Sequence, residues 1–188
     1  MASSRSVQLL RRVRAFHNQW TQMTTDLSLD QVNYRERSGV LPIAFSLHHY
    51  VVATDRAVAK RVFDDASVWE KGQWEEKVGA TVPSVTRGTP IEVAEELQFS
   101  DYNAWLAYQS EVFSQSDRGI AGLSDKDWDG VVWERLPEQL KGGYLDLVVG
   151  NDPVRLGELL DVWVLQHGMR HLGEIEHARA LIGLQGVG

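Results

Sequence analysis

The sequence contains no cysteine among its 188 residues. This absence excludes disulfide bonds, thiolate metal ligands and a cysteine nucleophile. Long apolar runs are also missing, because no segment approaches the roughly 20 residues that a membrane-spanning helix needs. The first residues, Met-Ala-Ser-Ser-Arg, lack the apolar core of a secretory signal. We therefore expect a cytoplasmic protein that does not associate with a membrane.

Positive charge is scarce as well. Lys and Arg number 19 against 26 Asp and Glu, which gives a formal net charge of −7. The only basic cluster consists of Arg11, Arg12 and Arg14, and it fits the solvated face of a helix. Because phosphate backbones are bound by clustered cations, we expect no nucleic-acid partner.

What remains is an ordinary globular composition, with 43% hydrophobic and 24% charged residues. The length predicts a single domain that spans residues 1–188. Hydrophobic residues recur every three to four positions in four segments, and strand patterns are nearly absent. We predict an all-α four-helix bundle with long connections between helices, in which the helices cover residues 6–27, Pro42 to Phe63 or Asp64, Thr89–Ser116 and Asp152–Leu184.

Two of the connections carry features of their own. Residues 65–90 are irregular, and their Trp69 and Trp74 either fold over the mouth of a site or attach the segment to the bundle. Attachment is the preferred interpretation. Residues 119–150 hold short pieces, with Ser124 at an N-cap and Leu145–Val149 as a short strand or part of a loop.

The fourth helix carries a His-x-x-x-His pair, His167 and His171, on an otherwise apolar stripe. Side chains at i and i+4 lie on one face of a helix, about 5–6 Å apart at their Cβ atoms. Both imidazoles can therefore reach one divalent metal ion, with a third ligand from elsewhere in the chain. Such pairs also arise by chance. Gly168 and Gly173 lie in the same helix, at a cost of about 1 kcal/mol each, so we expect close packing of another backbone there.

The other histidines are harder to assign from spacing. His48 and His49 lie side by side in the second helix, about 100° apart, and that helix is apolar around most of its circumference. Periodicity therefore does not decide which of the two faces a site. His17 fits a histidine at the edge of the core better than a ligand. Glu174, one turn beyond His171, is either a partner of the site or a carboxylate paired with Arg170 or Arg56.

Several segments together resemble the DinB-like (DinB/YfiT) superfamily of metal-binding bundles. Ile43-Ala44-Phe45-Ser46-Leu47-His48-His49-Tyr50 with Asp55-Arg56 is similar to the family's second-helix pattern, and His167-Gly168-Met169-Arg170-His171-Leu172-Gly173-Glu174-Ile175 to its fourth-helix pattern. Trp69–Gly79 and Ala180–Gly183 also match. The resemblance implies an up-down-down-up helix order and a divalent metal ion bound by His49, His167 and His171. Asp55 is expected in a salt bridge rather than in the site.

The resemblance also implies an activity. Characterised relatives are mostly transferases or isomerases that act with a small thiol, so the expected partner is a small-molecule substrate, such as a low-molecular-weight thiol. Zinc and nickel both suit imidazole ligation. A non-catalytic bundle that binds metal or a small ligand in a stress response remains the alternative. We also expect a homodimer.

Overall fold

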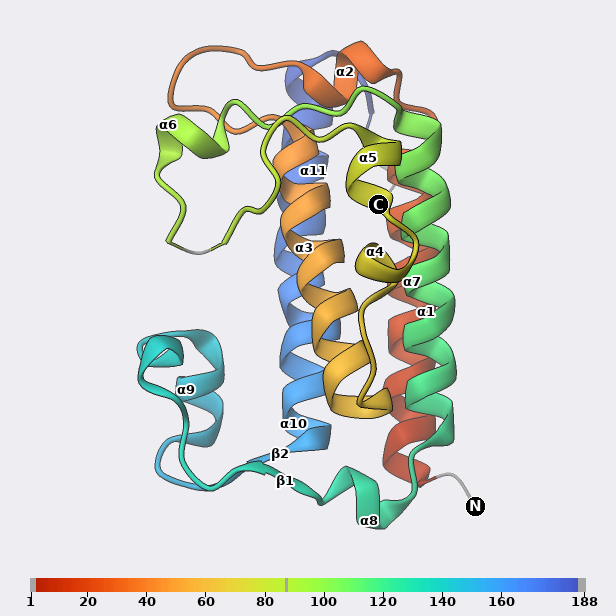
Figure 1. Ribbon diagram of the computed structural model, residues 1–188, viewed down its shortest axis with the longest axis vertical. Coiled ribbons are helices and arrows are strands. Elements are labelled where there is room, and N and C mark those ends of the chain that lie inside the picture. Colours follow the sequence, from red (N-terminus) through yellow and green to blue (C-terminus); the bar gives the residue numbers. More distant parts are fainter. Residues whose placement is uncertain (1–2, 87, 186–188) are drawn as a thin grey trace.

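The computed structural model describes residues 3–86 and 88–185, and four long helices pack together in it (Figure 1). The first helix runs upward in the figure, the second and third run downward, and the fourth runs upward again. This arrangement confirms the predicted four-helix bundle and its up-down-down-up order. The helical segments, in which η1 and η3 are π-helical, are α1 (Ser4–Thr24), α3 (Ile43–Val58) continued by η1 (Ala59–Phe63), α7 (Tyr102–Gly122), and α10 (Leu156–Leu160) continued by η3 (Asp161–Gln166) and α11 (His167–Leu181).

The core of the bundle is rich in aromatic side chains. α3 packs against α7 on one side and against α11 on the other, and α1 also contacts both. Trp20, Tyr50 and Trp105 are fully buried at the centre. Their polar atoms are partly paired, since Trp20 Nε1 donates a hydrogen bond of 2.8 Å to Gln109. This packing holds α3 and α11 at fixed positions beside each other.

The predicted first helix, residues 6–27, is shifted toward the N-terminus in the structure. α1 begins at Ser4, because the side chain of Ser3 accepts a hydrogen bond from the backbone of Arg5 as an N-cap. It ends at Thr24, and a separate short helix, α2 (Leu29–Asn33), follows in the connection to α3.

The prediction of one continuous third helix from Thr89 to Ser116 is wrong. The segment contains a short helix, α6 (Ile91–Ala94), and the long helix α7 begins only at Tyr102, where Asp101 caps it. Tertiary contacts interrupt the helical pattern between them: the backbone N–H of Phe99 pairs with Asn33, and the Phe99 ring stacks on Trp105. Helix α7 also continues past the predicted end, to Gly122.

The start of the fourth helix was also predicted wrongly. Asp152 and Pro153 do not cap it, because the next two residues form a strand, β2 (Val154–Arg155), that pairs antiparallel with β1 (Val131–Trp133). The helix begins at Leu156 and ends at Leu181. Leu145–Val149 is neither strand nor loop, since it belongs to α9 (Tyr144–Val149). The remaining short helices of this connection are α8 (Asp125–Trp128), capped by Ser124 as predicted, and the 3-10 turn η2 (Glu138–Leu140).

The tryptophans of residues 65–90 attach that segment to the bundle. Trp69 lies in α4 (Val68–Lys71) and is buried against Tyr108, with ring centroids 4.8 Å apart. Trp74 begins α5 (Trp74–Val78) and packs against the same tyrosine. The preferred interpretation of these tryptophans is therefore supported.

Asp55 fixes the start of α4. The salt bridge that we predicted for Asp55 is absent from the described part of the chain. Its carboxylate accepts hydrogen bonds from the backbone N–H groups of Val68 and Trp69, at 2.9 and 2.8 Å, and from the Tyr108 hydroxyl. A buried carboxylate at a helix N-terminus is stabilised by such N–H groups without a cation.

Within the described residues, the helices are too short or too polar to cross a membrane.

Candidate metal centre

Three histidines from two helices meet on one face of the bundle. His49 projects from α3, and His167 and His171 project from α11, which packs beside it. One ligand atom from each ring can be chosen so that all three lie within 4.8 Å of one another. The Nε2 atoms of His167 and His171 are 2.9 Å apart. Since metal–nitrogen bonds are about 2.0–2.1 Å long, a small side-chain rotation brings all three onto one ion.

Oxygen atoms behind the rings orient two of these imidazoles. His171 donates from Nδ1 to Oε2 of Glu174 at 2.6 Å, and the same oxygen accepts a hydrogen bond from Ser46. His49 Nδ1 lies 3.3 Å from the carbonyl oxygen of Val85. With the Nδ1 proton held by these acceptors, the Nε2 lone pair of each ring is free for a ligand, as in metal sites where an acceptor fixes the histidine tautomer.

The cluster is electrostatically suited to bind a cation. Burial, together with the adjacent His171 and His49, lowers the pKa of His167 from its ordinary value of 6.5 to about 3. Burial also lowers the pKa of His49. Burial alone raises the pKa of Glu174, but hydrogen bonds from His171 and Ser46 outweigh it and leave this pKa below its ordinary value. At neutral pH the site therefore offers His49 and His167 as neutral imidazoles, the form that metals bind, with the Glu174 carboxylate nearby.

The backbone around His167 is shaped by a π-helical turn and a glycine. The turn η3 ends directly before His167, and the buried Tyr50 hydroxyl donates a 2.7 Å hydrogen bond to the Val164 carbonyl within it. A Cβ atom on Gly168 would lie 2.4 Å from the Phe16 ring and 2.8 Å from that of Tyr50. Gly168 thus allows close packing, although of side chains rather than the predicted backbone. Gly173 has no atom of another residue near its Cβ position, so the prediction is wrong there.

His48 is directed away from the cluster. Its ring is buried between Trp69 and Trp105 on the α7 side of α3, and neither ring nitrogen has a hydrogen-bond partner among the described residues. Burial lowers the pKa of His48 to about 3. The structure thus brings His49, and not its neighbour, to the other two histidines.

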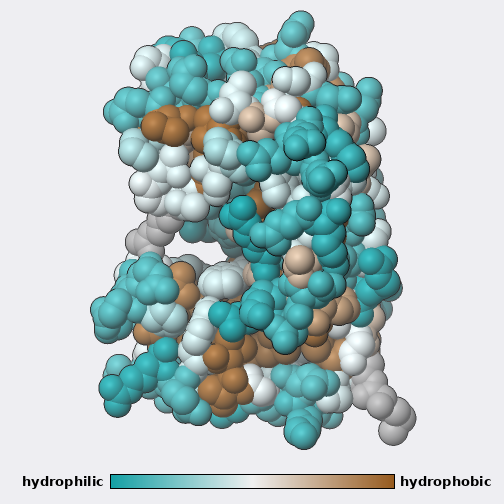
Figure 2. Space-filling view, viewed as in Figure 1, coloured by the Kyte–Doolittle hydropathy of each residue, from teal (hydrophilic) through white to brown (hydrophobic). Residues whose placement is uncertain are grey.

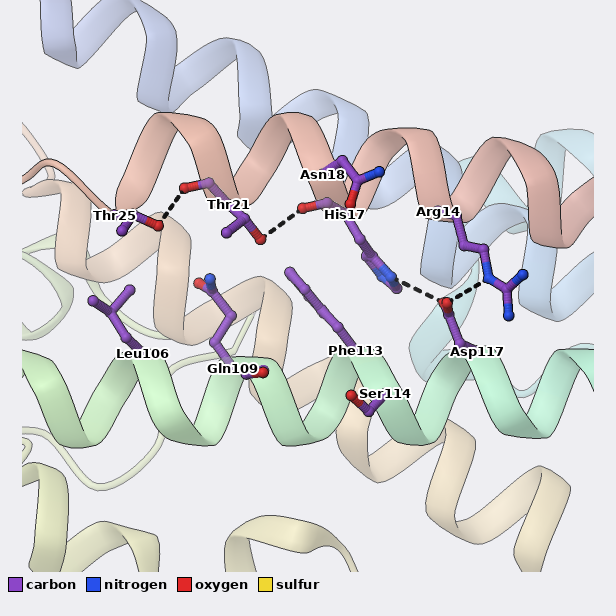
Figure 3. A pocket seen from close by; sticks show the side chains of 11 residues that line it. Arg14, His17, Asn18, Thr21, Thr25, Leu106, Gln109, Phe113, Ser114 and Asp117 are labelled. Atoms are coloured by element: carbon purple, nitrogen blue, oxygen red, sulfur yellow. Dashed lines mark hydrogen bonds and ion pairs between the residues drawn. The ribbon is translucent and has the colours of Figure 1, made fainter.

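His17 lies in a separate groove between α1 and α7, as predicted for a histidine at the edge of the core (Figure 3). Its ring stacks on Phe113 with centroids 3.9 Å apart, and its Nδ1 is 3.2 Å from Asp117, which also accepts a hydrogen bond from Arg14. Figure 3 shows that the hydroxyls of Thr21 and Thr25 are directed back to the backbone of α1. His17 Nδ1 and the two threonine hydroxyls thus have partners within α1 and α7, although His17 Nε2 has none among the described residues, and the ring packing indicates a structural role.

The three clustered histidines line one cavity of about 970 Å³. Helices α3 and η3–α11 form its floor, the segment around α6 forms one wall, and the segment that leads into α9 forms the other. Figure 2 shows the surface hollowed between these two segments, on the left side of the view. The remaining lining is mostly apolar, with three aromatic side chains: Leu41, Phe45, Ala53, Thr86, Thr89, Ile91, Ala94, Leu140, Gly142, Gly143, Tyr144, Leu145, Val162, Trp163, Gln166 and Arg170.

The geometry fits a metal ion with open coordination positions. Three imidazoles fill three positions and leave the rest facing the cavity, which is the arrangement of catalytic rather than structural sites. Glu174 lies behind His171 as a hydrogen-bond acceptor, and the alternative pairing with Arg170 or Arg56 is absent from the described residues. Sequence reasoning did not find Ser46 or Val85, because neither carries a spacing signal.

Comparisons with known proteins agree with this geometry. Residues 10–175 match the DinB superfamily. A crystal structure described as the conserved protein of locus from Enterococcus faecalis superposes with a TM-score of 0.75 at 12% sequence identity, covering 97% of this chain and 99% of that one, and it shows the same fold. No curated protein matches the sequence. The family match spans most of the chain, and the chain belongs to the DinB superfamily.

Proposed function

We propose that the protein is a divalent-metal-dependent transferase or isomerase that acts with a small thiol. One observation carries the proposal: His49, His167 and His171 converge at the floor of a cavity of about 970 Å³ that is large enough for a small organic substrate. Membership of the DinB superfamily supports it.

Each group of residues at the site has its own role in the proposed reaction. The three imidazoles hold the ion, and Glu174 keeps the Nδ1 proton on His171, so that the Nε2 lone pair stays directed at the cluster. A divalent ion bound here supplies Lewis acidity and lowers the pKa of a coordinated thiol or water. Since the chain has no cysteine, the thiol arrives as substrate. The apolar walls around Phe45 and Trp163 bind its partner and exclude water.

Zinc and nickel are the proposed ions. Both accept nitrogen ligands, whereas magnesium and calcium favour oxygen. The three candidate ligands are all imidazoles, and Glu174 contacts His171 instead of adding an oxygen to the cluster.

One observation favours a second function, in which the bundle binds a metal or small ligand without turnover. Among the described residues that line the cavity, none is an aspartate or glutamate. A general base for proton transfer is therefore lacking within the cavity itself, apart from the histidines.

Elemental analysis of the purified protein, followed by a thiol-transfer screen with and without chelator, tests both functions. A thiol-dependent rate that saturates as metal is restored supports the enzyme. Tight ligand binding without turnover supports the second function. Protein that binds no divalent metal after reconstitution contradicts the enzyme, and protein that binds neither metal nor a small ligand contradicts both.

A further inference from the structure

The cavity combines an apolar lining with a single unpaired cation. Arg170 is the only lysine or arginine among the described residues that line it, and none of those residues is an aspartate or glutamate. The charge of Glu174, one turn along α11, interacts with that of Arg170, but the Glu174 carboxylate is hydrogen-bonded to His171 and Ser46. Arg170 forms no ion pair or hydrogen bond within the described residues. Five other arginines, in contrast, pair with carboxylates of a different segment: Arg5, Arg12, Arg14, Arg35 and Arg179.

The charge of Arg170 acts at the histidine cluster. Arg170 directly precedes His171 on α11 and lines the same cavity as His49 and His167. A group bound to the guanidinium therefore sits next to the open face of the metal centre. The Glu174 carboxylate lies behind His171 and does not line the cavity, so the field of the described charged side chains that do line it is positive, in a chain whose net charge is −7. Such a field attracts anions that the rest of the surface repels.

The rest of the lining selects the other part of the ligand. Phe45, Trp163, Tyr144 and Leu140 provide apolar and aromatic surface across the cavity. We propose that the ligand of this cavity is an organic anion with an apolar body, and that Arg170 is its specificity-determining residue, binding the anionic group while the aromatic walls hold the body. A planar guanidinium presents paired N–H donors that match a carboxylate or a phosphate. The inference deepens the proposed function by naming a substrate class, and it rests on the same cavity.

Binding of three matched probes tests the inference by calorimetry. They are 4-phenylbutyrate, 4-phenylbutyl phosphate and the neutral 4-phenylbutyramide, measured with metal-free and with zinc-loaded protein. Wild type is expected to bind at least one anion about tenfold more tightly than the amide in both states, since hydrogen bonds to charged groups contribute about 1.5–3 kcal/mol. The preferred anion identifies the group. Arg170→Gln should abolish the preference, and Arg170→Lys should keep part of it.

Arg118→Gln is the matched control, because it removes the same charge from an exposed position on α7 that does not line the cavity. It should leave the preference intact. Equal binding of anion and amide by metal-free wild type, a preference that survives in Arg170→Gln, or binding of no probe at millimolar concentration overturns the inference. An Arg170-dependent preference in protein that fails to take up zinc supports the inference while contradicting the proposed metal-dependent function, so the two failures are distinguishable.

Discussion

Oxygen Oε2 of Glu174 bridges two helices, because it accepts one hydrogen bond from His171 on its own helix and another from Ser46 on α3. The Glu174 carboxylate thus fixes the tautomer of His171, and it is itself held by Ser46 of α3, the helix that carries His49. We expect Glu174→Gln to weaken metal affinity about 10- to 100-fold, measured by competition with a chromophoric chelator. Glu176→Gln, two residues along the same helix, should bind metal as wild type does. Equal affinity of the Glu174 and Glu176 variants would show that the contact does not tune the site.

Replacement of each clustered histidine should remove the metal. His49→Ala, His167→Ala and His171→Ala each leave two ligands, too few for a stable site, and metal content by mass spectrometry should collapse. Thermal stability should fall as well, since ligand at 100 times its Kd stabilises the native state by about 2.7 kcal/mol. His177→Ala, an exposed control on α11, should keep the metal.

His48→Ala separates the two adjacent histidines of α3. It should lower stability, because the ring is buried, yet retain the metal. If His48→Ala loses the metal and His49→Ala keeps it, the assignment of the second-helix ligand is wrong by one residue.

Two glycines of α11 should respond to alanine in opposite directions. Gly168→Ala places a methyl group against Phe16 and Tyr50, so overpacking should cost about 1–3 kcal/mol of unfolding free energy. Gly173→Ala meets no neighbour and should stabilise the helix by up to about 1 kcal/mol. Urea denaturation of metal-free protein measures both. A stabilised Gly168→Ala variant would contradict the close packing beside His167.

Acid should destabilise the bundle partly through His17. Burial lowers its pKa below 6.5 in the folded state, although Asp117 opposes the shift. A folded-state pKa below the unfolded one means that the unfolded chain takes up the proton first, so the stabilisation is present above pH 6.5 and is lost as the pH falls below it. His17→Phe should therefore show a shallower loss of unfolding free energy than wild type between about pH 6.5 and 5, by up to ~1 kcal/mol. Identical slopes in chelator-treated samples would contradict this.

The protein is expected to form a homodimer. The exposed apolar side chains Tyr144, Leu147 and Val148 all lie on α9, and Leu147 is 81% exposed. Light scattering should give twice the 21.2 kDa mass of the chain at micromolar concentration. Leu147→Glu should lower that mass if α9 forms the interface, whereas Val7→Glu, on exposed α1 surface, should not.

Local periodicity was sufficient to predict the bundle and the His167–His171 pair, because both depend only on spacing along one helix. The choice between His48 and His49 was not accessible in this way. Helix α3 is apolar around most of its circumference, so the faces are distinguished only by their neighbours, α7 for His48 and α11 for His49. The family resemblance supplied the choice that spacing left open.

The wrong bounds predicted for the third and fourth helices have a tertiary cause. The helical pattern from Thr89 onward is broken where Asn33 and Trp105 hold Phe99 in place, and these contacts cross from other segments. The fourth helix starts later than predicted because Val154 and Arg155 form a strand, which pairs with residues more than 20 positions earlier in the sequence. Ser46 and Val85 contact the site only because α3, α11 and residues 65–90 lie side by side in the fold, and no local sequence pattern predicts that arrangement.

The histidines stand on bundle helices, whereas much of the cavity wall belongs to the segments around α6 and α9. The candidate metal ligands and much of the surface that would contact the body of a ligand thus belong to different stretches of the chain. Connecting segments tolerate insertion and exchange better than core helices do. Exchange of these two stretches can therefore change which apolar body fits the cavity while the metal ligands stay the same. A chimaera that exchanges only residues 86–94 and 140–149 between relatives should change the preference for the body of the ligand, and it should leave metal affinity and the Arg170-dependent preference for an anion unchanged.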